Sequence, residues 1–410
     1  MSRSFRHGYL FVLASILFVG CGKKDLPDPD SAGPAPAAAS VGPPLTDEDY
    51  KAFSQQLENA VATGNTADAD HLLRLLDLFE RSIGDLELGA QFKKDLAKGA
   101  ARGAGKLSHE FVDCVKNGGS YIFLHVHSVD GQKRALFRMR HAEGAVNYHD
   151  YSLARYPDGQ IGTADIYVYL SGEPMSQSFR RVLLTLVSQK DQGMLARLKG
   201  ADQILTNNLS AVQSMSNDVR SGRHKEALAT FRKLPAELQN NRAFQMIAIQ
   251  AAQGTKDDRE YLAEMERFRK TFPNDPSADL LSLDYFMLKK QFDEGIQSLD
   301  RLNKSLGQDP YLDVLKGGML LEAGRLKEAR AVVERAIKAD MKIDLGYGMR
   351  VAIALREKNN KDVLIWLKKG IENNAVQVDI DELKNTPDYA EFVKSPEFQD
   401  LSDWLAKRPK

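Results

Sequence analysis

The chain has 410 residues, of which 43% are hydrophobic and 27% are charged, so it can form globular cores in two or three domains. Lysine and arginine together number 56, as do aspartate and glutamate, and the formal net charge is zero. This balance excludes the strongly basic composition of typical nucleic-acid-binding proteins, and we expect no nucleic-acid partner.

The N-terminus carries Arg3 and Arg6, then a mostly apolar run from Gly8 to Gly20, then Cys21. A basic start before a short apolar run is typical of a secretory signal, and the run is too short to span a bilayer. The residues LFVG before Cys21 resemble the lipobox of bacterial lipoproteins. This resemblance implies removal of residues 1–20 and acylation of Cys21. An ordinary signal peptide followed by an unrelated cysteine is the alternative.

An acylated Cys21 would anchor the protein to the cell membrane or the outer membrane, facing the periplasm or exposed at the cell surface. Residues 21–45 are rich in proline and alanine, which favours a semi-extended tether between this anchor and the folded chain. Cys114 would then have no partner for an intrachain disulfide, and its apolar neighbours indicate a buried thiol.

Residues 46–195 are predicted to form an α+β domain. Helical spacing of apolar residues indicates three helices, over residues 50–61, 72–79 and from 92 onward. After Gly119 the period changes to two, and turn signals divide the segment into a four-stranded antiparallel meander. A helix over residues 176–188 closes the domain. This order of elements resembles the cystatin-like and nuclear-transport-factor-2-like folds, which implies a pocket between the sheet and a helix.

The candidate polar pocket of this domain consists of His125, His127, His149 and Asp165. His125 and His127 are two residues apart and should project from one face of their strand, together with Tyr121 and Phe123. Such a set could bind zinc or place a general base beside a substrate. We favour the alternative, a structural polar patch, and expect no catalytic residue, no metal and no cofactor.

From residue 207 to 378 the chain is predicted to consist of paired helices that repeat every 34 residues. Steps of 34 from Gly222 reach four further polar turns, at Lys256, Lys290, Gly324 and Lys358. Buried positions are expected nine residues after each turn, at Phe231, Met265, Leu299, Val333 and Leu367, and mostly small residues five after it. This pattern resembles the tetratricopeptide repeat (TPR), most clearly in residues 311–340. A non-repeating helical bundle is the alternative.

The resemblance implies a solenoid whose first helices line a concave groove for a protein or peptide. The candidate groove residues are Asp279, Leu283, Tyr347 and Arg350. Residues 379–410 are predicted to be capping helices, because Thr386-Pro387 and Ser395-Pro396 each combine an N-cap hydroxyl with a proline at the first helical position.

The sequence therefore predicts a lipid-anchored cell-envelope protein without catalytic activity, which binds a protein or peptide through its TPR-like repeats and the membrane through Cys21. The alternative is that the α+β domain binds a small ligand or is catalytic, and the repeats serve as a docking arm.

Overall fold

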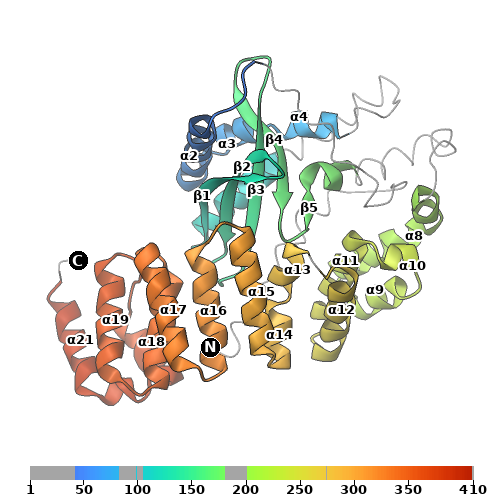
Figure 1. Ribbon diagram of the computed structural model, residues 1–410. Coiled ribbons are helices and arrows are strands. Elements are labelled where there is room, and N and C mark those ends of the chain that lie inside the picture. The colour runs from blue at the N-terminus through green and yellow to red at the C-terminus, as the bar shows by residue number, and fades with distance from the viewer. Residues whose placement is uncertain (1–41, 83–97, 99–104, 181–200, 274, 409–410) are drawn as a thin grey trace. The chain divides into compact units, whose positions relative to one another are not determined.

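The computed structural model describes residues 42–82, 98, 105–180, 201–273 and 275–408 (Figure 1). The predicted leader, Cys21, most of the tether, the helix expected from residue 92 and most of the helix expected over 176–188 lie outside these ranges. No helix among the described residues is both long enough and apolar enough to cross a membrane. Two compact units follow one another in the chain, with the division between Asp284 and Tyr285. The domain boundaries predicted from the sequence stay predictions.

The first unit contains an antiparallel meander in which each strand pairs with the next one along the chain. The strands are β1 (Ser120–Val129), β2 (Gln132–Arg140), β3 (Val146–Arg155), β4 (Ile161–Val168) and β5 (Glu173–Pro174). Asp130 and Gly131 both have positive φ, and they join β1 to β2 as a two-residue hairpin turn, as the Asp-Gly signal predicts. The prediction of four strands missed β5, because a two-residue strand is too short to show a period.

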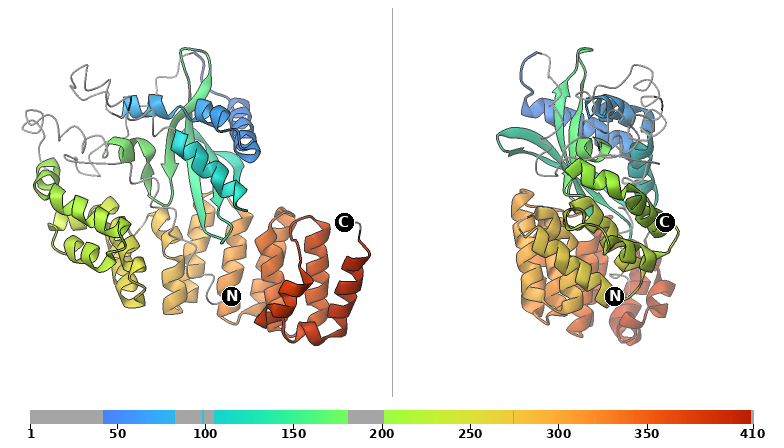
Figure 2. Two further views of the ribbon diagram at one scale, coloured as in Figure 1. Left: turned by 180° about the vertical axis from the view of Figure 1, so that it is seen from behind. Right: turned by 90° about the vertical axis from the view of Figure 1, so that its right-hand side faces the viewer.

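One face of this sheet is covered by helices α2 (Asp47–Thr63), α3 (Thr66–Leu73) and α4 (Leu75–Arg81) and by a helix over residues 105–116. Figure 2 (left) shows these helices in front of the strands. Helix α2 begins with a capping box between Thr46 and Asp49. The shared core is aromatic and aliphatic, and its fully buried members include Leu57, Leu73, Phe111, Phe137 and Tyr151.

The rest of the first unit is helical. Its helices are α8 (Ala201–Arg220), α9 (His224–Phe231), α10 (Ala236–Gln239), α11 (Arg242–Gly254), α12 (Asp258–Thr271) and α13 (Pro276–Leu281). Helix α14 (Leu283–Lys289) contains the division between the units. The second unit continues with α15 (Phe292–Ser305), α16 (Pro310–Glu322), α17 (Leu326–Ala339), α18 (Asp344–Arg356) and α19 (Asn360–Glu372). The fold is thus an α+β domain followed by a solenoid-like helical region.

The backbone confirms the 34-residue period of the helical region. Gly222, Lys256, Lys290, Gly324 and Lys358 all have φ between 54° and 75°, the left-handed conformation that ends a helix. After Gly222, Lys290, Gly324 and Lys358 the next residue donates its N–H to the carbonyl five residues earlier, as in a Schellman motif. The positions nine residues after each turn are buried, as predicted: Phe231, Met265, Leu299, Val333 and Leu367. The positions five residues after each turn are buried as well: Ala227, Tyr261, Gly295, Ala329 and Val363.

The end of the second unit comprises α20 (Ile380–Asn385), two 3-10 helices, η1 (Pro387–Tyr389) and η2 (Phe392–Lys394), and α21 (Pro396–Ala406). Both predicted helix starts occur, although the first opens only a 3-10 turn. Neither hydroxyl caps its helix, because Thr386 Oγ1 donates to the Glu382 carbonyl and Ser395 Oγ to the Phe392 carbonyl. Helix α21 packs against α19 and buries Phe398 and Leu401.

Candidate functional site

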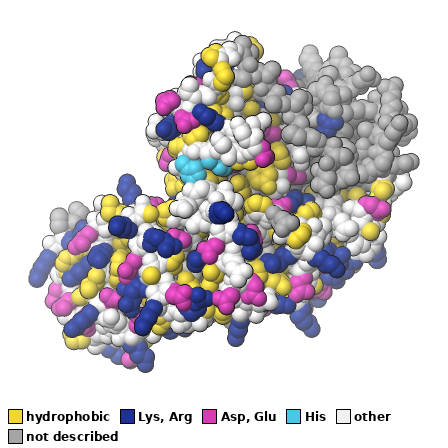
Figure 3. Space-filling model, in the orientation of Figure 1, with side chains coloured by type: hydrophobic (Ala, Val, Ile, Leu, Met, Phe, Trp, Pro, Cys, Tyr) yellow, Lys and Arg dark blue, Asp and Glu magenta, His cyan; other side chains and the backbone are white. Residues whose placement is uncertain are grey.

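A β-bulge decides which face of the sheet carries the two β1 histidines. Phe123 pairs with Phe137 and His125 with the adjacent Leu136, so Leu124 is an extra residue in β1. The bulge reverses the alternation, and His125 and His127 project from the face opposite to Tyr121 and Phe123. The expectation that all four side chains share a face is therefore wrong. Figure 3 shows histidine side chains at the surface, over the strands.

On this second face His127 is held by a buried carboxylate. Its Nε2 donates to Asp150 Oδ1 at 2.8 Å, and the exposed fractions of the two side chains are 15% and 1%. Arg134 Nη1 lies 3.6 Å from the other oxygen of Asp150. The His125 ring stands at 89° to that of His127, with 5.7 Å between the ring centroids. A carboxylate in this position fixes the orientation of the imidazole ring.

His149 lies on the opposite, helix-covered face. Asn147 Nδ2 donates to its Nε2 at 2.9 Å, and its Nδ1 bonds the Tyr121 hydroxyl at 3.2 Å. The Asn147 amide orientation follows from its Oδ1, which accepts the N–H groups of Tyr148 and Leu170. Burial lowers the pKa of His149 to about 3, so this imidazole is neutral at physiological pH. It is a satisfied residue of the core.

Asp165 is separate from both histidine environments. Ser176 donates both its backbone N–H, at 3.1 Å, and its hydroxyl, at 2.5 Å, to the Asp165 carboxylate. Burial raises the pKa of Asp165, and the hydrogen bonds from Ser176 oppose that change. The four predicted pocket residues therefore occupy three environments. Within the described ranges no group of three or more His, Cys, Asp or Glu side chains is arranged to hold a metal ion.

Three of the four candidate groove residues lie in the interior of the repeats. Leu283, Tyr347 and Arg350 are buried. Arg350 bridges Glu334 of α17 and Asp362 of α19 at 2.7 Å each, and its guanidinium lies 5.0 Å from the Trp366 ring centroid. These contacts hold neighbouring helices together, so these residues do not line a groove. Only Asp279 is partly exposed.

A different set of first-helix residues recurs at the repeat spacing in the second unit. We define the apolar stripe as Tyr311, Val314, Gly318 and Leu321 of α16 and, 34 residues later, Leu345, Gly348, Ala352 and Leu355 of α18. The α16 half is buried, whereas the α18 half is partly or fully exposed, and a Cβ atom on Gly348 would meet nothing within 4 Å. Extending the 34-residue register into the first helices would have found these positions.

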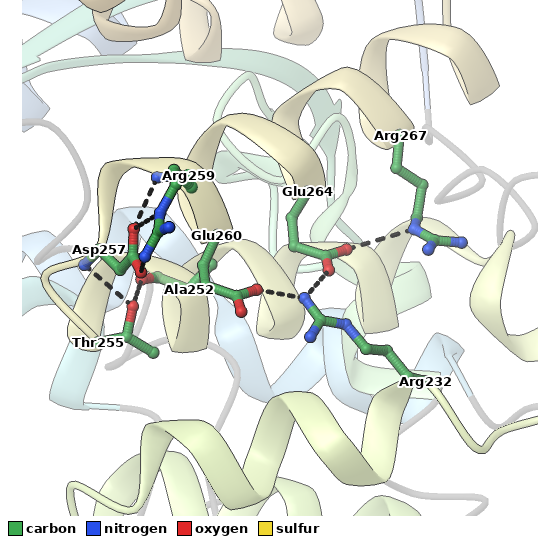
Figure 4. A network of polar contacts seen from close by, with 8 residues as sticks. All are labelled: Arg232, Ala252, Thr255, Asp257, Arg259, Glu260, Glu264 and Arg267. Atoms are coloured by element: carbon green, nitrogen blue, oxygen red, sulfur yellow. Dashed lines mark hydrogen bonds and ion pairs between the residues drawn. The ribbon is translucent and has the colours of Figure 1, made fainter.

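In the first unit an ion network joins consecutive helix pairs (Figure 4). The carboxylate of Glu264 on α12 is almost fully buried and lies 3.0 Å from Arg232 Nη2 and 3.3 Å from Arg267 Nε. Arg232, which follows α9, also pairs with Glu260. Arg267 in turn donates to the Gln239 side chain at 3.1 Å. This network is a structural connection between neighbouring repeats.

No family model matches this chain, and no curated protein matches it. Among solved structures it is similar to PilW, described as a widely conserved type IV pilus biogenesis factor, at 12% identity and a TM-score of 0.37, over 48% of this chain and 91% of PilW. It is also similar to MamA MSR-1 C2, at 14% identity and a TM-score of 0.32, over 41% of this chain and 97% of MamA. Both are TPR proteins. The repeat assignment itself rests on this chain's own 34-residue geometry.

Proposed function

We propose that this protein is a lipid-anchored scaffold of the cell envelope, which binds a protein or peptide partner through its TPR-like repeats and the membrane through an acylated Cys21. The role is non-catalytic. The anchoring part rests on the leader and on the lipobox-like residues before Cys21.

The observation that carries the binding role is the apolar stripe. Helices α15 and α17 expose mainly polar residues, whereas α18 carries partly exposed apolar residues on the stripe as well as apolar residues on the side packed against second helices. On α18, Tyr347 packs against Trp366, and Leu345, Ala352 and Leu355 lie on another side of the helix. The exposed apolar side of α18 fits an amphipathic helix or an extended apolar peptide.

Site-specific photocrosslinking in the native host tests this role. A photoreactive amino acid replaces Gly348 in the stripe, and the matched control replaces Ala331, an exposed residue of the second helix α17. We expect a discrete crosslinked partner from position 348 only, and loss of this product when Leu355→Glu is added. Equal products from both positions, or a product that is indifferent to Leu355→Glu, would reject the stripe as the binding surface.

One observation favours a second function, in which the α+β domain binds a small ligand. His127 is oriented by a buried carboxylate and keeps 15% of its own side chain exposed. Complementation of a deletion strain separates the two functions. Failure of His127→Gln with success of Leu355→Glu assigns the essential role to the sheet face, and the reverse result assigns it to the stripe.

A further inference from the structure

A second exposed surface in the second unit combines apolar and basic side chains. We define the cap surface as Lys361, Ile365, Lys368 and Lys369 of α19 together with Trp404 of α21 and Arg408, which follows that helix. Ile365 is 45% exposed, one of three large hydrophobic side chains among the described residues with comparable exposure. Its spacing from Lys361 and Lys368 places all three on one side of α19.

Contacts between α19 and α21 make this surface continuous. Lys368 Nζ lies 5.2 Å from the Trp404 ring centroid, and the Arg408 guanidinium lies 4.6 Å from it. On α19, Lys369 Nζ lies 4.3 Å from the centroid of the buried Trp366 ring. The packing of α21 is fixed by Phe398 and Leu401, which are buried, so the partly exposed Trp404 is not required for that core.

The charge of this surface is basic although the whole chain is neutral. Lys361, Lys368, Lys369 and Arg408 surround the two apolar side chains. The acidic residues nearest to them in the sequence are Asp362, which pairs with Arg350, and Glu372, Asp400 and Asp403. A tryptophan and an aliphatic side chain bordered by lysine and arginine match the boundary of a bilayer, where apolar groups enter below the headgroups and the cations pair with anionic lipid.

We propose that the cap surface is a membrane-docking site for anionic lipid headgroups. Trp404 and Ile365 enter the interface, and the four cations bind the headgroup phosphates. This contact goes beyond the proposed scaffold function. It would hold the end of the repeats against the same kind of surface to which the acylated N-terminus is proposed to attach.

Trp404 provides the local readout, since the chain has only two tryptophans. The test uses the full chain with Cys21→Ser, which prevents acylation, and Trp366→Phe, which makes Trp404 the sole indole. Circular dichroism first verifies that this chain is folded. Its fluorescence is then recorded with vesicles of phosphatidylcholine alone and with vesicles that also contain phosphatidylglycerol, with and without brominated acyl chains.

We expect a blue shift and bromolipid quenching of Trp404 only with anionic vesicles, and both should weaken as salt is added. Lys361→Glu/Lys368→Glu should lower the vesicle affinity by about tenfold or more, since each interfacial cation contributes roughly fivefold. Lys384→Glu/Lys394→Glu makes the same charge change on α20 and η2 and should leave the affinity within about threefold. Ile365→Ser should weaken binding without changing the charge.

Absence of the Trp404 response, an equal response to neutral vesicles, or equal losses in the two charge-reversal variants would overturn the proposal. In the first case an acidic protein would become the better occupant of this basic surface. Crosslinking at Gly348 does not depend on any of these residues, so failure of the docking site and failure of the scaffold function are distinguishable.

Discussion

Two glycines of the second unit should respond in opposite ways to the same added methyl group. Gly317 lies where α16 crosses α17, and a Cβ there would come 2.3 Å from Val333 Cγ2. Gly348 lies within α18, and its Cβ would enter open space. Alanine is favoured over glycine in a helix interior by about 1 kcal/mol, so Gly348→Ala should raise the free energy of unfolding by about that amount.

Gly317→Ala gains the same helix propensity and adds a steric overlap. An ordinary carbon–carbon contact is about 3.5–4.0 Å, so the methyl group would overlap Val333 by more than about 1 Å. Val333 is fully buried and β-branched, and its preferred helical rotamer cannot be given up cheaply. Overpacking costs about 1–3 kcal/mol, and we expect a net destabilisation of about 1–2 kcal/mol after the propensity gain.

Urea unfolding followed by circular dichroism measures both changes on the full chain. The double variant Gly317→Ala/Val333→Ala removes Cγ2, so its loss of stability should be smaller than the sum of the single losses. A Gly317→Ala chain as stable as the wild type would refute the close crossing of α16 and α17. If the losses of stability in the double variant are additive, the added methyl group of Gly317→Ala does not clash with Val333.

Three further predictions concern the turns, the ion network and the buried histidine. Lys358→Gly should stabilise the chain by about 0.5–1 kcal/mol, because lysine at φ 54° is strained where glycine is not, and Gly324→Lys at φ 75° should destabilise it by a similar amount. Thermal unfolding measures the melting temperatures of both variants, and a shift of the same sign in both would contradict the role of backbone strain. Glu264→Gln should cost about 1–3 kcal/mol in urea unfolding, because the 3% exposed carboxylate loses its charge-assisted contacts, while Arg232 and Arg267 remain hydrated. The control Glu260→Gln should cost under about 1 kcal/mol, since Glu260 is 36% exposed, and a similar loss in both variants would argue against the burial effect. The pKa of His149 is about 3 in the folded chain and near 6.5 when exposed, so the unfolded chain binds more protons between these values. The contribution of neutral His149 to the free energy of unfolding is therefore complete above about pH 6.5 and is lost as the pH falls toward 3. Urea midpoints at pH 7, 5 and 4 should fall less steeply for His149→Gln than for the wild type, and parallel curves would exclude this histidine as a cause.

Local sequence was sufficient for the helical region and for most of the sheet. Each turn, and the apolar residue nine positions after it, can be recognised within a short stretch of sequence. The 34-residue spacing could therefore place Lys256, Lys290 and Lys358 at turns although they are not glycine. The Asp130-Gly131 turn is local in the same sense, and it fixes the pairing of β1 with β2.

Side-chain partners of the candidate site depended on contacts between distant residues. One extra residue near Leu124 moved His125 and His127 to the other face of the sheet, and no periodicity reveals an insertion of one residue. The sequence places both Asp150 and Asp165 on later strands, and strand register decides that Asp150, 23 residues away, is the carboxylate that holds His127.

The sequence by itself determined the order of the domains, the 34-residue period and the positions buried between paired helices, because each follows from short-range spacing. Only the tertiary structure decided that Tyr347 and Arg350 pack between helices while Leu345 and Leu355 stay partly exposed. On an α-helix, a change of one or two positions turns a side chain by about 100° or 200°, and the packing of the neighbouring helices selects which side is covered.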